Sequence, residues 1–415
     1  MIEREVTPQL RRWFNKYPVL TITGPRQSGK TTLARQAFPH LRYVDLEAPD
    51  EQEAATVDPR GFLARYPDGV ILDEIQHVPE LASYIKVLVD ADRRNGRFVL
   101  TGSEQFGLTK TISQSLVGRS ALFRLWPFTL AERRLAGAAG GIDDILHSGF
   151  MPRLHDEGLH PPRFFEEYYR EYVERDILRL GRISNVRAFR NVVRLLAGRV
   201  GQPVNLSSLS RDTGVAHTTI SEWLGVLEAC DIIFRLEPYY ANIRKRITKS
   251  PKLYFVEVGL ASHLVRIKEP EDLWSSPYRG QLFENAAVIE AVKHCHNRDL
   301  LPDFYFLRTG AGFECDLLYE RGDGLVVIEI KAGATLNRAW FDRLARAAQT
   351  IPGVVETALV YGGAERIERS GVPAVPIDRL SELLEALTTR PEQTPPGQPA
   401  VHHTRNGESH GEAAE

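Results

Sequence analysis

Short apolar runs alternate with amphipathic segments along the first 135 residues of the chain. The apolar runs predict β-strands at residues 18–23, 41–45, 69–74, 97–103 and 121–125. Apolar positions at helical spacing predict intervening helices at residues 31–38, 59–66 and 79–93. Strands that are apolar throughout and alternate with helices are typical of a parallel sheet covered on both faces. We therefore predict an α/β, doubly wound parallel sheet whose ligand lies at the C-terminal ends of its strands.

A glycine-rich loop separates the first strand from the first of these helices. Its sequence is Gly24-Pro25-Arg26-Gln27-Ser28-Gly29-Lys30-Thr31-Thr32, which fits the phosphate-loop pattern of Gly, four residues and Gly-Lys-Ser/Thr. Backbone amides at a helix N-terminus bind polyphosphates. Lys30 would contact the β- and γ-phosphates, and the Thr31 hydroxyl would hold Mg²⁺. The loop therefore predicts ATP and Mg²⁺ as cofactors.

Polar side chains at two other strand ends supply the chemistry that a phosphate loop lacks. Asp73 and Glu74 end one apolar strand, and Thr101 and Ser103 end the next. Asp73 would hold Mg²⁺, and Glu74 would polarise the attacking water as a general base. Thr101 or Ser103 would hydrogen-bond that water or the γ-phosphate. Because parallel strands end at one edge of the sheet, we predict that these groups form a single site.

These motifs resemble those of an AAA-type ATPase, in particular a large group of prokaryotic AAA-type ATPases. The resemblance rests on Gly-Pro-Arg-Gln-Ser-Gly-Lys-Thr-Thr-Leu, Leu-Asp-Glu-Ile-Gln and Leu-Thr-Gly-Ser, which begin at positions 24, 72 and 100. It implies ATP hydrolysis, with Ser103 or Thr101 as the sensor residue. In ring-forming relatives an arginine completes a neighbour's site, and Arg119 is the candidate here. The alternative for Arg119 is a surface arginine before a strand. The finger interpretation implies a homo-oligomer with shared ATP sites.

The middle of the chain changes to a helical pattern. Residues 136–185 predict a helical lid or connector, in which an aromatic stripe at Phe165, Tyr168, Tyr169 and Tyr172 would be buried. Residues 186–262 predict a winged helix, with Asn205 as an N-cap and residues 216–229 as the recognition helix. That helix would expose His217, Thr218, Ser221 and Glu222.

A basic segment at residues 243–249 would lie on the wing and suits contacts with phosphates. We therefore predict DNA or another nucleic acid as a partner. The alternative is a helix-turn-helix unit used for packing or oligomerisation.

The last folded block, residues 263–389, contains a second set of charged residues. Glu284 lies on a predicted helix, Asp316 on a strand, and Glu329 and Lys331 on one face of the strand at residues 325–331. This order resembles the restriction-endonuclease-like PD-(D/E)XK family, and also the C-terminal domain of unknown function in the ATPase group. The resemblance implies that Glu284, Asp316 and Glu329 hold Mg²⁺ and that Lys331 helps to activate water. The alternatives are a salt-bridged strand edge, or a nuclease-like fold kept only for binding or assembly.

Composition narrows the class of protein. Charged residues form 26% and hydrophobic residues 43% of the 415 residues, with a net charge of −2, so any polyanion-binding surface must be local. The three cysteines are too few for a disulfide framework, no apolar run reaches membrane-spanning length, and the N-terminus does not resemble a signal peptide. We expect a cytoplasmic protein with no membrane contact. The proline-rich tail at residues 390–415 is predicted to be disordered.

The predicted domains are an ATPase at residues 1–135, the lid at 136–185, the winged helix at 186–262 and the nuclease-like domain at 263–389. Two functions follow from this organisation. The first is a Mg²⁺-dependent ATPase coupled to nucleic-acid binding or processing. The second is a switch-type ATPase whose C-terminal domain is catalytically inactive and serves protein-partner binding or ring assembly.

Overall fold

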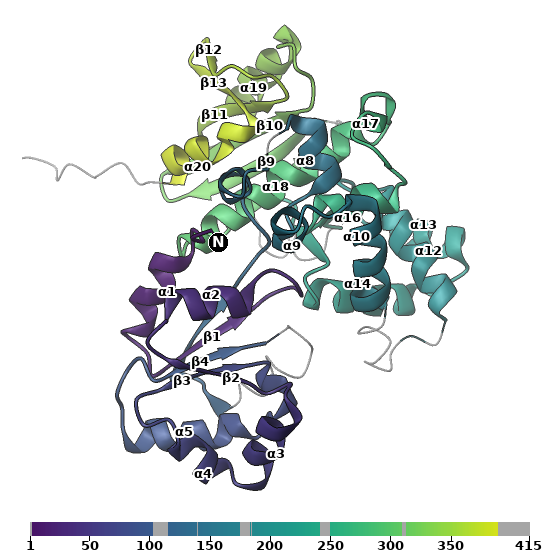
Figure 1. Ribbon diagram of the computed structural model, residues 1–415. Helices are drawn as coiled ribbons and strands as arrows, with labels where there is room; N and C mark the ends of the chain where they lie inside the picture. Colours follow the sequence, from purple (N-terminus) through teal and green to yellow (C-terminus); the bar gives the residue numbers. More distant parts are fainter. Residues whose placement is uncertain are drawn as a thin grey trace, which may run out of the picture.

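The computed structural model describes residues 2–102, 115–138, 140–174, 183, 185–240, 250–308 and 313–388. Its elements form an N-terminal α/β unit, a helical middle part and a C-terminal unit built on a second sheet (Figure 1). The α/β fold class predicted from the sequence is confirmed. The predicted disorder of residues 390–415 concerns a segment outside the described residues.

The N-terminal sheet has five strands in the order β2-β3-β4-β1-β5, and every neighbouring pair is parallel. The strands are β1 (Val19–Thr23), β2 (Arg42–Asp45), β3 (Val70–Asp73), β4 (Phe98–Thr101) and β5 (Ser120–Arg124). Each matches a predicted apolar run. Because β1 lies between β4 and β5, the loop that follows it stands at the C-terminal edge of the sheet, next to the end of the central strand β4.

Helices cover both faces of this sheet, as the apolar strands require. The elements are α1 (Thr7–Phe14), α2 (Lys30–Ala37), α3 (Pro49–Val57), α4 (Pro59–Ala64), the 3₁₀ turn η1 (Ile75–His77) and α5 (Leu81–Ala91). Leu20 and Ile22 pack with α1 and α2, while Val19 packs on the opposite face with α4 and α5. Helix α3 was not predicted, because Ala55 is its one buried residue and its sequence has little apolar periodicity.

The middle part is mainly helical and contains a small antiparallel sheet formed by β6 and β7. Its elements are α7 (Leu130–Leu135), α8 (Ile142–Ser148), α9 (Pro152–Asp156), α10 (Pro161–Tyr168), the π-helical η2 (Tyr169–Glu174), α12 (Val186–Ala197), α13 (Leu206–Thr213), α14 (His217–Ala229), β6 (Ile233–Leu236), β7 (Lys252–Phe255), α16 (Val258–Leu264) and α17 (Asp272–Ser275).

Several details of this part agree with the sequence. The Ser208 amide donates to Asn205 Oδ1 at 2.9 Å, so Asn205 caps α13 as predicted. Helix α14 exposes the four predicted polar residues and buries Ile220 and Leu227. The order α12-α13-α14-β6-β7 is the one predicted for a winged helix. The basic segment at residues 243–249 lies outside the described residues, and its role stays a prediction.

The C-terminal unit is a six-stranded mixed sheet in the order β12-β13-β11-β10-β9-β8. Its elements are α18 (Arg279–Asn297), β8 (Phe304–Arg308), β9 (Glu314–Arg321), β10 (Gly324–Lys331), α19 (Arg338–Thr350), β11 (Val354–Tyr361), β12 (Ile367–Arg369), β13 (Val372–Pro376), η3 (Ile377–Arg379) and α20 (Leu380–Thr388). Val326, Ile328 and Ile330 pack in the core that contains α18, and Leu325 and Val327 pack on the other face with α19. The predicted period-2 pattern of β10 is confirmed.

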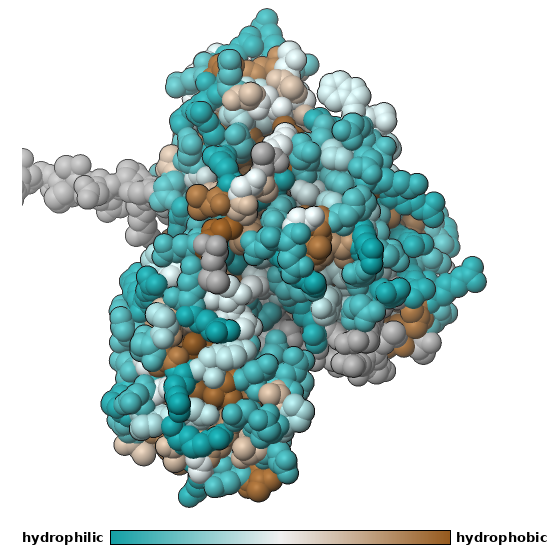
Figure 2. All heavy atoms as spheres, viewed as in Figure 1, coloured by the Kyte–Doolittle hydropathy of each residue, from teal (hydrophilic) through white to brown (hydrophobic). Residues whose placement is uncertain are grey.

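Helix α18 connects the three parts of the molecule (Figure 1). Its apolar residues share one core with the middle part and with the C-terminal sheet. Just beyond its C-terminus, Asp299 Oδ2 accepts a hydrogen bond of 2.7 Å from Trp13 Nε1 of α1. Figure 2 shows a mostly hydrophilic face with small, separate hydrophobic patches. Within the described ranges, no helix has the length and apolar character needed to span a bilayer.

Candidate functional site

The glycine-rich loop between β1 and α2 has a backbone that glycine makes possible. Gly24 has φ 137° and Gly29 has φ 90°, and Gln27 also has a positive φ of 62°. A Cβ atom on Gly24 would lie 2.1 Å from the Leu125 carbonyl oxygen, so a larger residue there would displace β5 or the loop. Gly29 forms the N-cap of α2 in the left-handed conformation. The loop therefore wraps the helix N-terminus tightly, as phosphate binding requires.

Hydrogen-bond donors of this loop are available to an anion. Within the described residues, the backbone amides of Gln27 and Gly29 donate to no protein acceptor, and the buried Ser28 hydroxyl has no partner. Lys30 Nζ donates to the carbonyl oxygens of Gly24 and Pro25 at 3.0 and 2.9 Å. Burial lowers the pKa of Lys30 to about 8, although Glu74 and Asp73 act in the opposite direction. The predicted loop residues therefore fit the phosphates of ATP.

Asp73 lies beside the loop and has several hydroxyl partners. Thr31 Oγ1 donates to Asp73 Oδ2 at 2.7 Å, and the Tyr43 hydroxyl donates to the same oxygen at 2.8 Å. Thr101 Oγ1 donates to the other carboxylate oxygen. A hydroxyl and a carboxylate in contact are oxygen ligands of the kind that Mg²⁺ prefers, so Thr31 and Asp73 fit the predicted metal. Burial and the Asp73 contact raise the pKa of Tyr43, which keeps its hydroxyl protonated as a donor.

Glu74 follows Asp73 in a left-handed backbone conformation, with φ 52° and ψ 48°. Gln76 Nε2 donates to Glu74 Oε2, which orients the carboxylate. Its negative charge, like that of Asp73, acts to raise the pKa of Lys30, so the carboxylate lies within electrostatic range of the loop. The structure thus brings together Lys30, Thr31, Asp73, Glu74 and Thr101. Ser103 lies outside the described residues, and its sensor role stays a prediction.

Two residues that contact the loop were missed by sequence reasoning. Arg4 donates to the carbonyl oxygens of Ser28 and Trp126 at 2.9 and 2.7 Å, and its Nε lies 3.0 Å from Glu132 Oε1. The Tyr172 hydroxyl accepts a hydrogen bond of 2.9 Å from Gln27 Nε2. In the sequence, Arg4 is one of many charged residues near the N-terminus. Tyr172 belongs to an aromatic stripe that predicted a core position.

Arg119 lies at the opposite edge of the sheet, because it directly precedes β5 and its carbonyl oxygen accepts from the Val19 amide at the start of β1. Its guanidinium forms a two-point ion pair with Asp90 of α5, with distances of 2.5 and 3.0 Å. It therefore does not belong to the site of its own chain. Its predicted role in a neighbouring chain's site stays a prediction.

Three of the four predicted residues of the C-terminal unit, Asp316, Glu329 and Lys331, contact one another. Lys331 Nζ lies 2.8 Å from Asp316 Oδ2 and 2.7 Å from Glu329 Oε1. The Ile330 amide also donates to Asp316 Oδ2, at 2.9 Å. Burial raises the pKa of Glu329 to about 7, and the nearby Asp316 carboxylate acts in the same direction. Lys331 thus lies between Asp316 and Glu329, two of the three carboxylates that the resemblance assigned to Mg²⁺.

Glu284 has a second lysine as its partner, and the sequence did not predict it. Lys252 Nζ lies 3.0 Å from Glu284 Oε1 and 2.8 Å from Glu314 Oε1, and the Tyr254 hydroxyl donates to Glu284 at 2.6 Å. Burial lowers the pKa of Lys252, but Glu284 and the other carboxylates outweigh burial and raise it overall. In the part of the chain that the structure describes, no group of three or more His, Cys, Asp or Glu side chains is arranged to hold a metal ion.

Three family models match the chain. Residues 16–133 match an AAA domain, residues 140–271 match a domain of unknown function (DUF8612), and residues 279–380 match another domain of unknown function (DUF4143). The first match covers the strands and loops that carry the phosphate-loop site. The second spans both the predicted lid and the predicted winged helix.

Two curated relatives match almost the whole chain. The uncharacterized protein Rv2008c of Mycobacterium tuberculosis is 30% identical over 381 residues, which cover 91% of this chain and 84% of the relative. The uncharacterized protein Mb2031c of Mycobacterium bovis matches with the same identity and coverage.

Solved structures share less with this chain. The Walker-type ATPase paby2304 of Pyrococcus abyssi is 16% identical, with 64% of this chain and 96% of that chain covered and a TM-score of 0.42. A RuvB variant of Thermotoga maritima is 18% identical, with coverages of 56% and 90% and a TM-score of 0.29.

Proposed function

This chain belongs to the same protein family as the two mycobacterial relatives and contains an AAA domain, and on that premise we propose that it is a Mg²⁺-dependent ATPase that acts as a conformational switch. The observation that carries the proposal is the convergence of Lys30, Thr31, Asp73 and Glu74 at the C-terminal edge of one parallel sheet. Phosphoryl transfer needs a positioned phosphate, a metal and an oriented water, and these four side chains supply the groups for all three.

The protein groups divide the work of hydrolysis. Bound Mg²⁺-ATP supplies the electrophilic γ-phosphoryl group. The loop amides and Lys30 hold the phosphates and compensate the charge that develops on them. Thr31 and Asp73 would hold Mg²⁺ through their oxygens. Glu74 accepts a proton from the attacking water, and Thr101 holds the Asp73 carboxylate in place.

Two variants separate binding from hydrolysis. Lys30→Ala should abolish ATP turnover, because the loop loses its positive side chain. Glu74→Gln should still bind Mg²⁺-ATP but hydrolyse it about 10²- to 10⁴-fold more slowly, the usual contribution of a general base. Nucleotide binding is measured by fluorescence titration and hydrolysis by phosphate release. ATP turnover at the wild-type rate in Lys30→Ala would contradict the assignment.

The switch part of the proposal rests on contacts between the loop and the middle part. In this structure Lys30 contacts two loop carbonyls, and Gln27 contacts Tyr172. A triphosphate would compete with the carbonyls for the Lys30 amine. Arg4 links the same loop to Trp126 and Glu132 at the start of the middle part. A rearranged loop would therefore change the contacts that position α7 and η2. This is the path by which nucleotide state would reach the rest of the chain.

For the C-terminal unit, we favour a role in binding or assembly over cutting. The observation that supports this choice is the pairing of Lys252 and Lys331 with the very carboxylates that a metal would need. Because each ammonium group already compensates a carboxylate, Mg²⁺ would have to displace a lysine from these acids. The cluster then acts as an ionic contact between β7, α18 and the C-terminal sheet.

Nucleic-acid binding remains a second candidate, and the observation that favours it is the polar, exposed N-terminal turn of α14, with His217, Thr218 and Ser221. One experiment tests both points. DNA and RNA are incubated with the wild type and with Asp316→Ala in Mg²⁺, and both retention in a gel and cleavage are recorded. We expect no cleavage by either protein. Cleavage by the wild type that Asp316→Ala abolishes would establish the nuclease interpretation instead.

A further inference from the structure

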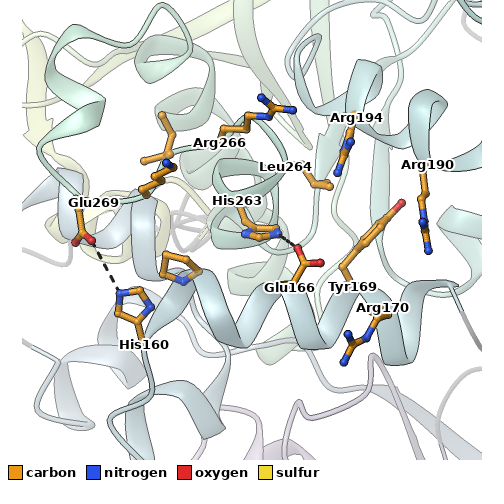
Figure 3. A pocket seen from close by; sticks show the side chains of 13 residues that line it. His160, Glu166, Tyr169, Arg170, Arg190, Arg194, His263, Leu264, Arg266 and Glu269 are labelled. Carbon is orange, nitrogen blue, oxygen red and sulfur yellow. Dashed lines mark hydrogen bonds and ion pairs between the residues drawn. The ribbon is translucent and has the colours of Figure 1, made fainter. Parts of the chain in front are cut away.

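A cavity of about 750 Å³ lies in the middle part, outside the phosphate-loop site (Figure 3). Its walls come from α10 and the beginning of η2, from α12, and from the turn that follows α16. Five basic side chains line it, namely Arg170, Arg190, Arg194, Arg266 and Lys268. No residue of the glycine-rich loop contributes to its lining. This is therefore a second candidate site, with its own chemistry.

The two acidic residues of the cavity, Glu166 and Glu269, offset only part of this charge, and Arg170 forms an ion pair with Glu171 at 3.4 Å. Figure 3 shows Glu166 pointing toward His263 and Glu269 pointing toward His160. The distances are 3.1 Å for the first pair and 4.0 Å for the second. Among the described residues, Arg194, Arg266 and Lys268 take part in no ion pair. A concave surface with excess charge of one sign concentrates ligands of the opposite sign.

The remaining walls are apolar and aromatic. Leu264, Ile267 and Pro162 line the cavity together with the ring of Tyr169. Pockets of roughly 300–1,000 Å³ that combine apolar walls with a few placed charges are typical of small-molecule sites. A nucleic-acid strand would instead need an extended positive track. The size and the lining therefore favour a compact anion over a polymer.

We infer that this cavity binds a small ligand of nucleotide size that carries two or more phosphate groups. Guanidinium groups bind phosphate oxygens in pairs, and Arg194, Arg266 and Lys268, which form no ion pair within the described residues, supply positive charge for the phosphates of such a ligand. The apolar wall would contact the uncharged part of the ligand. The inference goes beyond ATP hydrolysis, because binding here does not depend on the phosphate loop.

The cavity also lies next to a contact with the phosphate loop. Tyr169 and Arg170 line it, and Tyr172, less than one turn further along η2, holds Gln27 of the loop. This segment is π-helical, a geometry found frequently at functional sites. A ligand that shifts η2 would thus change the loop. This effect on hydrolysis rests on the proposed function, whereas the binding itself does not.

Pyrophosphate binding to the full chain tests the inference. The Lys30→Ala background removes the phosphate loop as a competing site, and binding is measured by isothermal titration calorimetry. We expect pyrophosphate to bind this protein and to lose about tenfold or more in affinity when Arg194→Gln and Arg266→Gln are added, since each substitution removes a charge-assisted contact to phosphate. The matched control adds Arg60→Gln and Arg366→Gln, two exposed arginines away from the cavity, and should leave the affinity unchanged.

Three results would overturn the inference. The first is no pyrophosphate binding to Lys30→Ala, and the second is equal affinity with and without the cavity arginines. The third is that a single-stranded oligonucleotide binds and needs these arginines, while pyrophosphate does not bind. That result would make the surface a nucleic-acid contact. Because no arm requires ATP turnover, failure of this inference is distinct from failure of the ATPase assignment.

Discussion

Lys30 combines a buried position with a chemical task. Its ammonium group donates hydrogen bonds to two loop carbonyls in place of water, yet burial still lowers the pKa of Lys30 to about 8. Phosphate oxygens would stabilise the charged form far better than neutral carbonyls do. The pKa of Lys30 should therefore rise when a nucleotide binds, so that binding takes up a proton wherever the free amine is neutral.

This linkage predicts that nucleotide affinity falls as the pH rises above about 8. The free protein then loses the Lys30 proton that the complex needs, and each further pH unit should cost up to about tenfold in Kd. Calorimetric titration with a non-hydrolysable ATP analogue between pH 7 and 9.5 measures the effect. Lys30→Arg, whose guanidinium stays charged throughout, should give a flat profile with weaker overall affinity. Parallel profiles for the two proteins would contradict the role of Lys30.

At the end of α8 in the middle part, the backbone lies close to the Glu257 side chain. Gly149 ends α8 with φ 64° and ψ −148°, a region that is essentially restricted to glycine. The next amide, that of Phe150, donates to both oxygens of the Glu257 carboxylate at 2.9 and 3.1 Å. Glu257 in turn caps α16 through the Gly259 amide at 3.0 Å. One buried carboxylate therefore joins two helices, and burial raises its pKa to about 7.

Gly149→Ala should destabilise the protein more than Gly158→Ala. Both glycines have positive φ, but a Cβ atom on Gly149 would lie 1.7 Å from Glu257 Oε1, whereas a Cβ atom on Gly158 would meet nothing within 4 Å. We expect a cost of about 1–2 kcal/mol for Gly158→Ala from its backbone conformation. Gly149→Ala should cost about 1–3 kcal/mol more because of the overpacking. Urea unfolding followed by tryptophan fluorescence measures the free energy of unfolding of both variants. Equal losses of stability would show that the Glu257 side chain moves aside at little cost.

In the molecule as a whole, the candidate arginine finger and the phosphate loop lie at opposite edges of one sheet. Arg119 lies before β5, and Lys30 lies after β1. An arginine finger at Arg119 could therefore act only on another copy of the chain. The ion pair with Asp90 would have to open for this to happen.

Mixing two inactive variants tests such sharing. Arg119→Ala alone should lower hydrolysis by about 10³- to 10⁵-fold without loss of nucleotide binding. Glu74→Gln alone should also be inactive. In a mixture, a site with Glu74 from one chain and Arg119 from the other is complete, so phosphate release should recover. No recovery at any ratio of the two proteins would show that Arg119 completes no shared site.

Local sequence was sufficient for much of the fold and for the phosphate-loop site. Apolar runs identified all five parallel strands. The inner strands β1, β3 and β4 are buried throughout and must therefore be apolar, whereas the edge strands β2 and β5 are only partly buried. The loop was identified because its conformation needs glycine at Gly24 and Gly29. Asp73 and Glu74 followed from the rule that parallel strands end at one edge. Within the predicted helical lid the bounds of α8 and α9 were not given, and α17 was not predicted at all, because a few residues carry no clear periodicity.

The sequence by itself thus determined the parallel sheet, the glycine-rich loop and the acids at the strand end, since each depends on neighbours along the chain. The tertiary structure alone decided which distant groups meet. It placed Arg4 and Tyr172 on the loop, and it gathered the basic residues around one cavity. It also paired Lys252 with Glu284. The physical reason is that a charge on a strand or helix has many possible partners in sequence, and packing selects one of them.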